Sequence, residues 1–153
     1  MAVEYDLESD TQAEITEIRA FLETALGGDP SPDGTVFCQG MYVMSTRIAP
    51  DEERSTAELT GFTHRITVTF RFANLATPDV RDRNTALMVK SVIAFSERFG
   101  GSGLLLFNGE RAVAQWTPDG LVFDSGWEDW TEVAAVIPLL AGHTMRALPQ
   151  PFL

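Results

Sequence analysis

The clearest pattern in the chain is a strict alternation of apolar and polar positions from Phe62 to Phe72. Apolar side chains, with His64 among them, occupy every second position, and threonines and arginines occupy the positions between. A period of two over this length predicts a long strand with one buried and one solvated face. β-Branched and aromatic residues favour the same conformation. We therefore expect this strand to lie centrally in an antiparallel sheet.

The first part of the chain predicts further strands and one helix. Residues 2–8 alternate in the same way and predict a first strand with an acidic outer face. A capping-box pattern at residues 11–14 predicts the start of an amphipathic helix, which ends at Gly27. Residues 29–34 are typical of a turn-rich loop, and residues 35–49 predict one or two strands.

The last part of the chain predicts a long helix followed by a meander. Apolar side chains recur at three- and four-residue steps over residues 79–99, which is typical of an amphipathic helix. Residues 104–124 predict three strands, and the first turn between them is Asn108–Gly109. A third helix is predicted to begin at Trp127 and to end at Pro138, and no element is assigned to the tail beyond it.

These elements together predict one α+β domain over residues 1–153. We expect a mainly antiparallel sheet of about 6–7 strands, estimated from the count of alternating runs. The expected order is strand, helix, three strands, helix, three strands, helix. The helices are expected to pack on one face of the sheet, because each helix has a single apolar stripe to bury.

The charge is distributed very unevenly along the chain. The net charge is −11, and residues 1–60 carry 13 acidic side chains against three arginines. Such an acidic surface repels phosphate backbones and attracts basic proteins, so no nucleic-acid binding is expected. An acidic exterior also serves solubility alone. If it steers a basic partner, we expect Asp51, Glu52 and Glu53 on a polar loop to contribute.

Known catalytic motifs and metal-ligand clusters are absent from the sequence. The two histidines, His64 and His143, have no neighbouring cysteines or carboxylates at metal-ligand spacing, and Cys38 is the single cysteine. We therefore predict no enzyme activity, no cofactor and no metal. The single cysteine, the acidic N-terminus and the lack of a long apolar run predict a cytoplasmic protein without a membrane segment.

Two stretches are candidate partner-binding surfaces. Tryptophan is enriched at interface hot spots, and acids beside it suit a basic partner, as in the run Trp127, Glu128, Asp129 and Trp130. The alternative is that both indoles pack inward. The second stretch is the polar face of the long strand, which is either solvated or a flat docking surface. It comprises Thr63, Arg65, Thr67, Thr69 and Arg71.

Several segments in this order resemble the Sit-type immunity proteins of bacterial polymorphic toxin systems. They are the first strand, the long strand with Gly61 before it, the amphipathic helix, the hairpin Gly103–Trp116, and a tryptophan at 127 or 130. The tail after Pro138 is longer and richer in proline than this resemblance implies.

The resemblance implies a cytosolic antidote that binds a cognate toxin domain and blocks it, with no catalytic residues. Two other functions are compatible with the residues. One is a small-ligand-binding or enzymatic domain with a pocket between the second helix and the sheet, where His64, Arg65 and Tyr42 would be the polar groups. The other is a homodimeric module that pairs through the threonine and arginine face. The sequence leaves monomer and homodimer open.

Overall fold

The computed structural model describes residues 3–51 and 61–150. The helices are α1 (Ile15–Leu26), α3 (Pro78–Phe99), α4 (Glu128–Thr131) and α5 (Ile137–Leu140). The strands are β1 (Val3–Ser9), β2 (Asp29–Pro30), β3 (Val36–Cys38), β4 (Met41–Arg47), β5 (Ile66–Phe72), β6 (Gly103–Phe107), β7 (Arg111–Thr117), β8 (Gly120–Asp124) and β9 (Thr144–Arg146).

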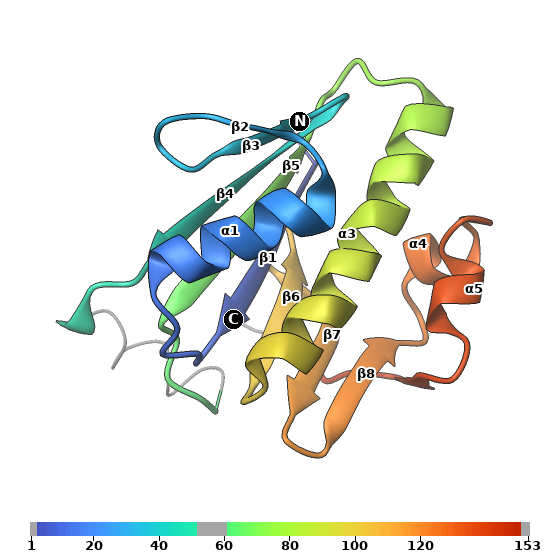
Figure 1. Ribbon diagram of the computed structural model, residues 1–153. Coiled ribbons are helices and arrows are strands. Elements are labelled where there is room, and N and C mark those ends of the chain that lie inside the picture. Colours follow the sequence, from blue (N-terminus) through green and yellow to red (C-terminus); the bar gives the residue numbers. More distant parts are fainter. Residues whose placement is uncertain (1–2, 52–60, 151–153) are drawn as a thin grey trace.

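Within these residues the strands form one nine-stranded sheet in the order β2-β3-β4-β5-β1-β6-β7-β8-β9 (Figure 1). Every neighbouring pair is antiparallel except β8 and β9, which are parallel. The predicted α+β class with a mainly antiparallel sheet is confirmed, but the predicted count of 6–7 strands is too low. The two-residue β2 and the three-residue β9 account for the difference, because each is too short to produce an alternating pattern.

The long alternating segment forms β5, next to β1 in the interior of the sheet. Ile66, Val68, Phe70 and Phe72 are buried, as predicted, and the threonines and arginine between them are partly exposed. The strand begins at Ile66 rather than at Phe62. The buried face of β5 therefore forms one side of the main core.

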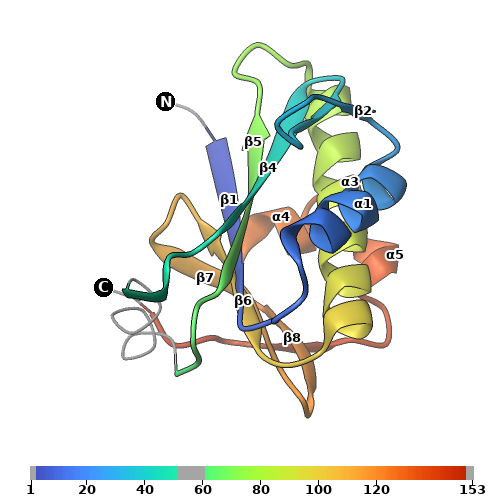
Figure 2. The same ribbon diagram turned by 60° about the vertical axis from the view of Figure 1, so that its left-hand side comes forward.

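Helices α1 and α3 cover this buried face, and Figure 2 shows both on the same side of the sheet. Helix α3 confirms the second predicted helix, with Met88, Val92 and Phe95 buried against the sheet residues. Thr77 caps its first turn by accepting a hydrogen bond from the amide of Val80 at 3.4 Å.

The capping box predicted for α1 is wrong. The helix begins at Ile15, and its first flanking residue, Glu14, makes no side-chain capping bond. The hydroxyl of Thr11 instead accepts a hydrogen bond from the amide of Ala13 at 3.2 Å. The amide of Asp10 donates to the carbonyl of Ser102, which keeps this residue beside the sheet. The chain therefore turns at residues 11–14, and the helix begins only at Ile15.

The meander of β6, β7 and β8 follows the prediction closely. Asn108 and Gly109 both have positive φ, at 50° and 74°, which is the conformation that a tight hairpin turn requires. The first residue of β6 is a glycine, Gly103. A side chain does not fit at this position, because a Cβ atom would lie 2.1 Å from the ring of Trp116. The β6–β7 register shifts between Leu105 and Leu106, which places a bulge opposite them.

The predicted third helix is wrong in extent. The chain forms only the four-residue α4 after Trp127, and a separate short helix, α5, begins at Ile137. Val136 is the buried residue between them, whereas Ala134 and Ile137, which were expected to face the core, are exposed. The tail then adds β9 beside β8.

The side of the sheet opposite α1 and α3, which we call the outer face, carries a second, smaller apolar cluster. Leu104, Leu106 and Ala112 of this face are covered by Leu148 from the tail, and Phe62 packs against them. The side chain of Gln150 accepts a hydrogen bond from the amide of Ala112 at 3.0 Å. The tail therefore covers the β6–β8 half of the outer face.

Candidate partner-binding surface

The other half of the outer face is formed by β4, β5 and β1, and its polar side chains stand in rows across the strands. Residues that are directly opposite in an antiparallel register point to the same side. In the register of these strands, each acid of β1 lies opposite one residue of β5 and, beyond it, one of β4. The three rows are Glu4–Arg71–Tyr42, Asp6–Thr69–Met44 and Glu8–Thr67–Thr46.

Each acid of β1 has a different polar neighbour. Glu4 forms an ion pair with Arg71 at 3.2 Å between Oε2 and Nη1. Asp6 accepts a hydrogen bond from the hydroxyl of Thr69 at 2.7 Å. Glu8 lies 3.6 Å from Nδ1 of His64. Of the three acids, Glu4 is thus paired with a permanent cation among the described residues, and Arg65 on the same face donates to the carbonyl of Asp10 at 3.0 Å.

The surroundings of Asp6 and Glu8 disfavour their charged forms. Burial raises the pKa of Asp6, although the hydrogen bond from Thr69 acts in the opposite direction. Burial, and then the negative charge of Asp6, raise the pKa of Glu8 to about 7. The two partly buried carboxylates lie on neighbouring positions of one face, so the charge of Asp6 disfavours ionisation of Glu8.

A second polar cluster lies near the N-terminal end of β1, where Tyr5 pairs with Phe107 beside the β6–β7 turn. The indole Nε1 of Trp127 donates to the hydroxyl of Tyr5 at 3.0 Å, and that hydroxyl donates to Asp129. Burial, and then the negative charge of Asp129, raise the pKa of Tyr5 far above its ordinary value, so the phenol stays protonated. The guanidinium of Arg111 lies 5.1 Å from the centre of the Trp127 ring and bonds to Asp124 at 2.8 Å.

Replacing Tyr5 with phenylalanine is expected to lower the free energy of unfolding by about 1 kcal/mol, because the hydroxyl joins Trp127 to Asp129. Urea denaturation followed by circular dichroism measures the change. Tyr42→Phe is the control, since the Tyr42 ring is only partly buried and packs on Phe37. Equal stabilities of the two variants would contradict a structural role for the Tyr5 hydroxyl.

The two tryptophans singled out from the sequence have different surroundings. Trp127 is partly exposed and packs on Phe107 at 4.6 Å between ring centres. Trp130 is only 1% exposed, and its Nε1 donates to the carbonyl of Val113 at 2.8 Å. The indole of Trp130 therefore belongs to the main core, and Trp127 is the tryptophan whose side chain is accessible to a partner.

Among the described residues, Asp51 lies apart from Trp127 and the acids beside it. Asp51 is exposed at the end of the first described segment, and Glu52 and Glu53 lie outside the described residues. Glu128 is exposed and Asp129 is partly exposed beside Trp127. β4 ends where Ser9 pairs with β5, whereas Trp127 contacts Tyr5, four residues away or roughly 13 Å along β1.

The acid row of β1 points to the outer face, whereas Tyr5 and its contact Trp127 lie on the opposite, helix-covered side of the sheet. The row was only half visible from the sequence. Alternation predicted that Glu4, Asp6 and Glu8 share an outward face. The pairing of this row with Thr67, Thr69 and Arg71 depends on β1 and β5 being neighbours, although they are more than fifty residues apart. No local pattern reports such a long-range register.

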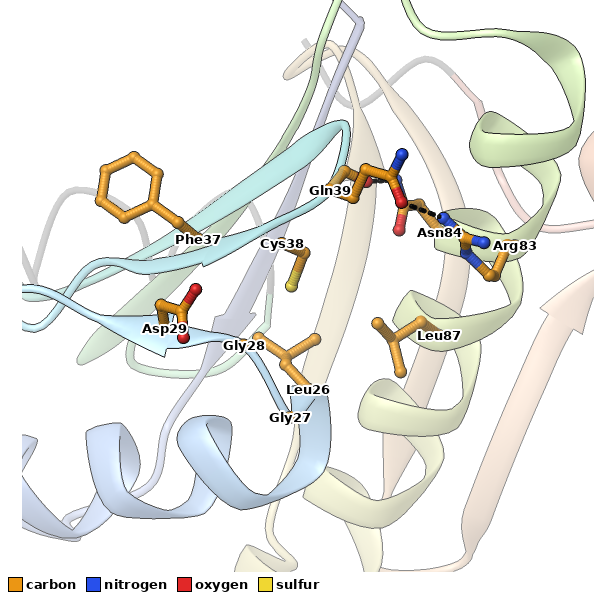
Figure 3. A pocket seen from close by; sticks show the side chains of 10 residues that line it. All are labelled: Leu26, Gly27, Gly28, Asp29, Phe37, Cys38, Gln39, Arg83, Asn84 and Leu87. Atoms are coloured by element: carbon orange, nitrogen blue, oxygen red, sulfur yellow. Dashed lines mark hydrogen bonds between the residues drawn. The ribbon is translucent and has the colours of Figure 1, made fainter.

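A pocket of about 260 Å³ lies between α3 and the β2–β3 hairpin (Figure 3). Asn84 and Arg83 of α3 reach toward it, but both donate to Gln39, at 2.8 and 3.0 Å. Cys38 also lines it, and burial raises the pKa of its thiol, which keeps the thiol unreactive. This volume is below that of a usual small-molecule site.

The polar groups suggested for a small-ligand pocket are elsewhere. Tyr42, His64 and Arg65 are not among the residues that line the pocket of Figure 3. The Nε2 atom of His64 lies 2.6 Å from the hydroxyl of Thr67, and Arg65 donates to the carbonyl of Asp10 at 3.0 Å. Residues 3–51 and 61–150 contain no cluster of three or more histidine, cysteine or acidic side chains that could hold a metal ion.

Comparison with known families decides what kind of protein carries these surfaces. Residues 3–134, well over half of the chain, match the model of the family described as SitI3-like. The chain belongs to the SitI3-like family. This membership agrees with the resemblance to Sit-type immunity proteins that the sequence pattern indicates. Neither a curated protein nor a solved structure matches the chain significantly.

The SitI3-like match ends before α5, β9 and the tail. These residues are nevertheless integral to this fold, because Val136 and Leu140 belong to the main core and Leu148 to the small one. In the part of this SitI3-like chain that the structure describes, no helix is long and apolar enough to cross a membrane.

Proposed function

We propose that this SitI3-like protein is an immunity protein that binds the toxin domain of its cognate partner and blocks it without catalysis. Family membership carries the proposal. We further propose that the toxin domain is basic and that binding takes place in the cytosol. The net charge of −11 supports a basic partner, because the two proteins would then attract one another before contact.

We propose two contributions to binding: acidic side chains attract the toxin domain, and one aromatic side chain holds it in the complex. Residues 1–60 hold almost all of the excess negative charge, so this part of the chain provides the attraction. Trp127, with Glu128 exposed and Asp129 partly exposed beside it, is the proposed anchor. Trp130 supports it from the core. Trp130 is not part of the proposed contact, because its side chain is buried.

Steering predicts that the association rate depends strongly on salt. The probe is the purified toxin domain encoded by the adjoining gene, mixed with this protein by stopped flow. We expect the association rate constant to fall about tenfold or more between roughly 20 and 150 mM salt, because screening shortens the range of attraction. The dissociation rate should change much less. An association rate that is indifferent to salt would contradict steering by charge.

The charge of the outer face argues against pairing of two copies through the acid row. A two-fold contact with its axis near this row would bring Glu4, Asp6 and Glu8 of one copy close to the same acids of the other. Such an arrangement places like charges together at a partly buried surface, which is destabilising. We therefore propose that the free protein is a monomer, which sedimentation equilibrium tests directly.

A further inference from the structure

We propose that the toxin docks on the β4–β5–β1 half of the outer face, and that it presents a segment with arginine or lysine at alternate positions to Glu4, Asp6 and Glu8. This inference rests on the proposed function, because it names the surface that such a toxin uses. It names a site on the side of the sheet opposite to Trp127, separate from the proposed anchor, and it specifies the chemistry of the partner.

The spacing of the three acids fits an extended basic segment. Alternate residues of a strand lie about 7 Å apart on one face, so the carboxylates of Glu4, Asp6 and Glu8 follow one line at this interval. Side chains two residues apart in an extended partner have the same spacing. One cation of the partner can therefore meet each acid without any distortion of either chain.

Asp6 and Glu8 are partly exposed on this face, and 16% of the Glu8 side chain is accessible. Both lie opposite threonines of β5, whose side chains are short. On the other side, Leu106 and Leu104 of β6 are already covered by the tail. The docking surface is thus bounded by the covered half of the outer face and continues across β5 to β4.

The charges of this surface are incompletely balanced within the chain. Arg71 balances Glu4 at 3.2 Å, but Asp6 is opposed by the neutral hydroxyl of Thr69. Glu8 has His64 at 3.6 Å, which is a cation only when protonated. A lysine or arginine from a partner would supply the missing counter-charge over Asp6 and Glu8.

The ionisation of Glu8 gives the contact a signature in proton release. Its pKa of about 7 means that roughly half of the Glu8 side chains carry a proton at neutral pH. A cation nearby favours the charged form, so docking releases that proton and affinity rises with pH. The charged or titratable groups nearest Glu8 are Asp6 and His64, and Arg65, which precedes β5, donates to the carbonyl of Asp10 at 3.0 Å.

A double variant, Asp6→Asn with Glu8→Gln, tests the surface. Against the toxin domain of the adjoining gene, we expect its Kd to rise at least about 100-fold, because two charge pairs at the centre of the contact are lost. The matched control is Asp119→Asn with Glu97→Gln, which removes the same charge from exposed positions outside residues 1–60. We expect the control to change Kd by less than about threefold.

Isothermal titration in two buffers of different ionisation enthalpy gives a second measurement at pH 7. The wild type should release about half a proton on binding, and Glu8→Gln should release markedly less. Equal Kd values for the double variant and the control would overturn the docking surface while the proposed function stands. A wild-type protein that neither binds nor neutralises the toxin domain would overturn the proposed function itself.

Discussion

Replacing Trp130 with alanine is expected to lower the free energy of unfolding by about 4 kcal/mol. The indole is 1% exposed, and its ring packs against Phe123 at 5.6 Å and Tyr5 at 6.3 Å between centres. Truncation leaves a large cavity and removes the donor to Val113, whose carbonyl lies at the β7 bulge. Urea denaturation, followed by far-ultraviolet circular dichroism, measures the loss.

The control for this experiment is Trp127→Ala, which removes the same side chain from a partly exposed position. We expect it to cost only about 1–2 kcal/mol, because part of the ring is already solvated. A Trp130 variant as stable as the Trp127 variant would show that the core is not built around Trp130. The pair also separates folding from binding, since Trp127→Ala tests the proposed anchor in a protein that remains folded.

Replacing Glu8 with glutamine is expected to raise the free energy of unfolding by about 2 kcal/mol at pH 8 and to leave it unchanged at pH 4. The pKa of Glu8 is about 7 in the folded protein against 4.5 ordinarily, so the folded state holds its proton more tightly. Above pH 7 both states are ionised, and the folded state then bears the cost of a partly buried charge. The expected change of about 2 kcal/mol is smaller than the pKa difference alone would give, because solvent screens the partly exposed carboxylate.

A pH series of urea denaturation curves checks this sign. The wild type should lose stability relative to Glu8→Gln as the pH rises from about 4.5 to 7, because the unfolded chain releases its proton first. Glu23→Gln is the control, since Glu23 is exposed on α1, and its curve should follow the wild type. A glutamine variant that is less stable than the wild type at pH 8 would contradict the assignment.

The elements with long periodic patterns were the ones that the sequence predicted well. β5 and α3 each have enough residues for the period to be unambiguous, and each buries the stripe that was expected. The turn at Asn108–Gly109 was equally clear, because few residues adopt positive φ at both positions. These features are encoded locally, so a local pattern suffices to find them.

The features that were missed depend on contacts between distant residues. The spacing of Trp130, Val133, Ala134 and Ile137 fits a helix, but Trp130 must reach Val113 and Val136 must enter the core, which the short α4 and α5 permit. Similarly, the three residues of β9 are ordered by β8 rather than by their own pattern. The acid row became a candidate surface only when its neighbours on β5 were known.

The position of β1 has a consequence for synthesis of the protein on the ribosome. Both of its neighbours come much later in the chain, since β5 ends at Phe72 and β6 ends at Phe107. One edge of β1 therefore stays unpaired until β5 has emerged at residue 72, and the other until β6 has emerged at residue 107. During that interval Glu4, Asp6 and Glu8, which alternate with Tyr5 and Leu7, discourage self-association, because charges within an apolar strand oppose aggregation.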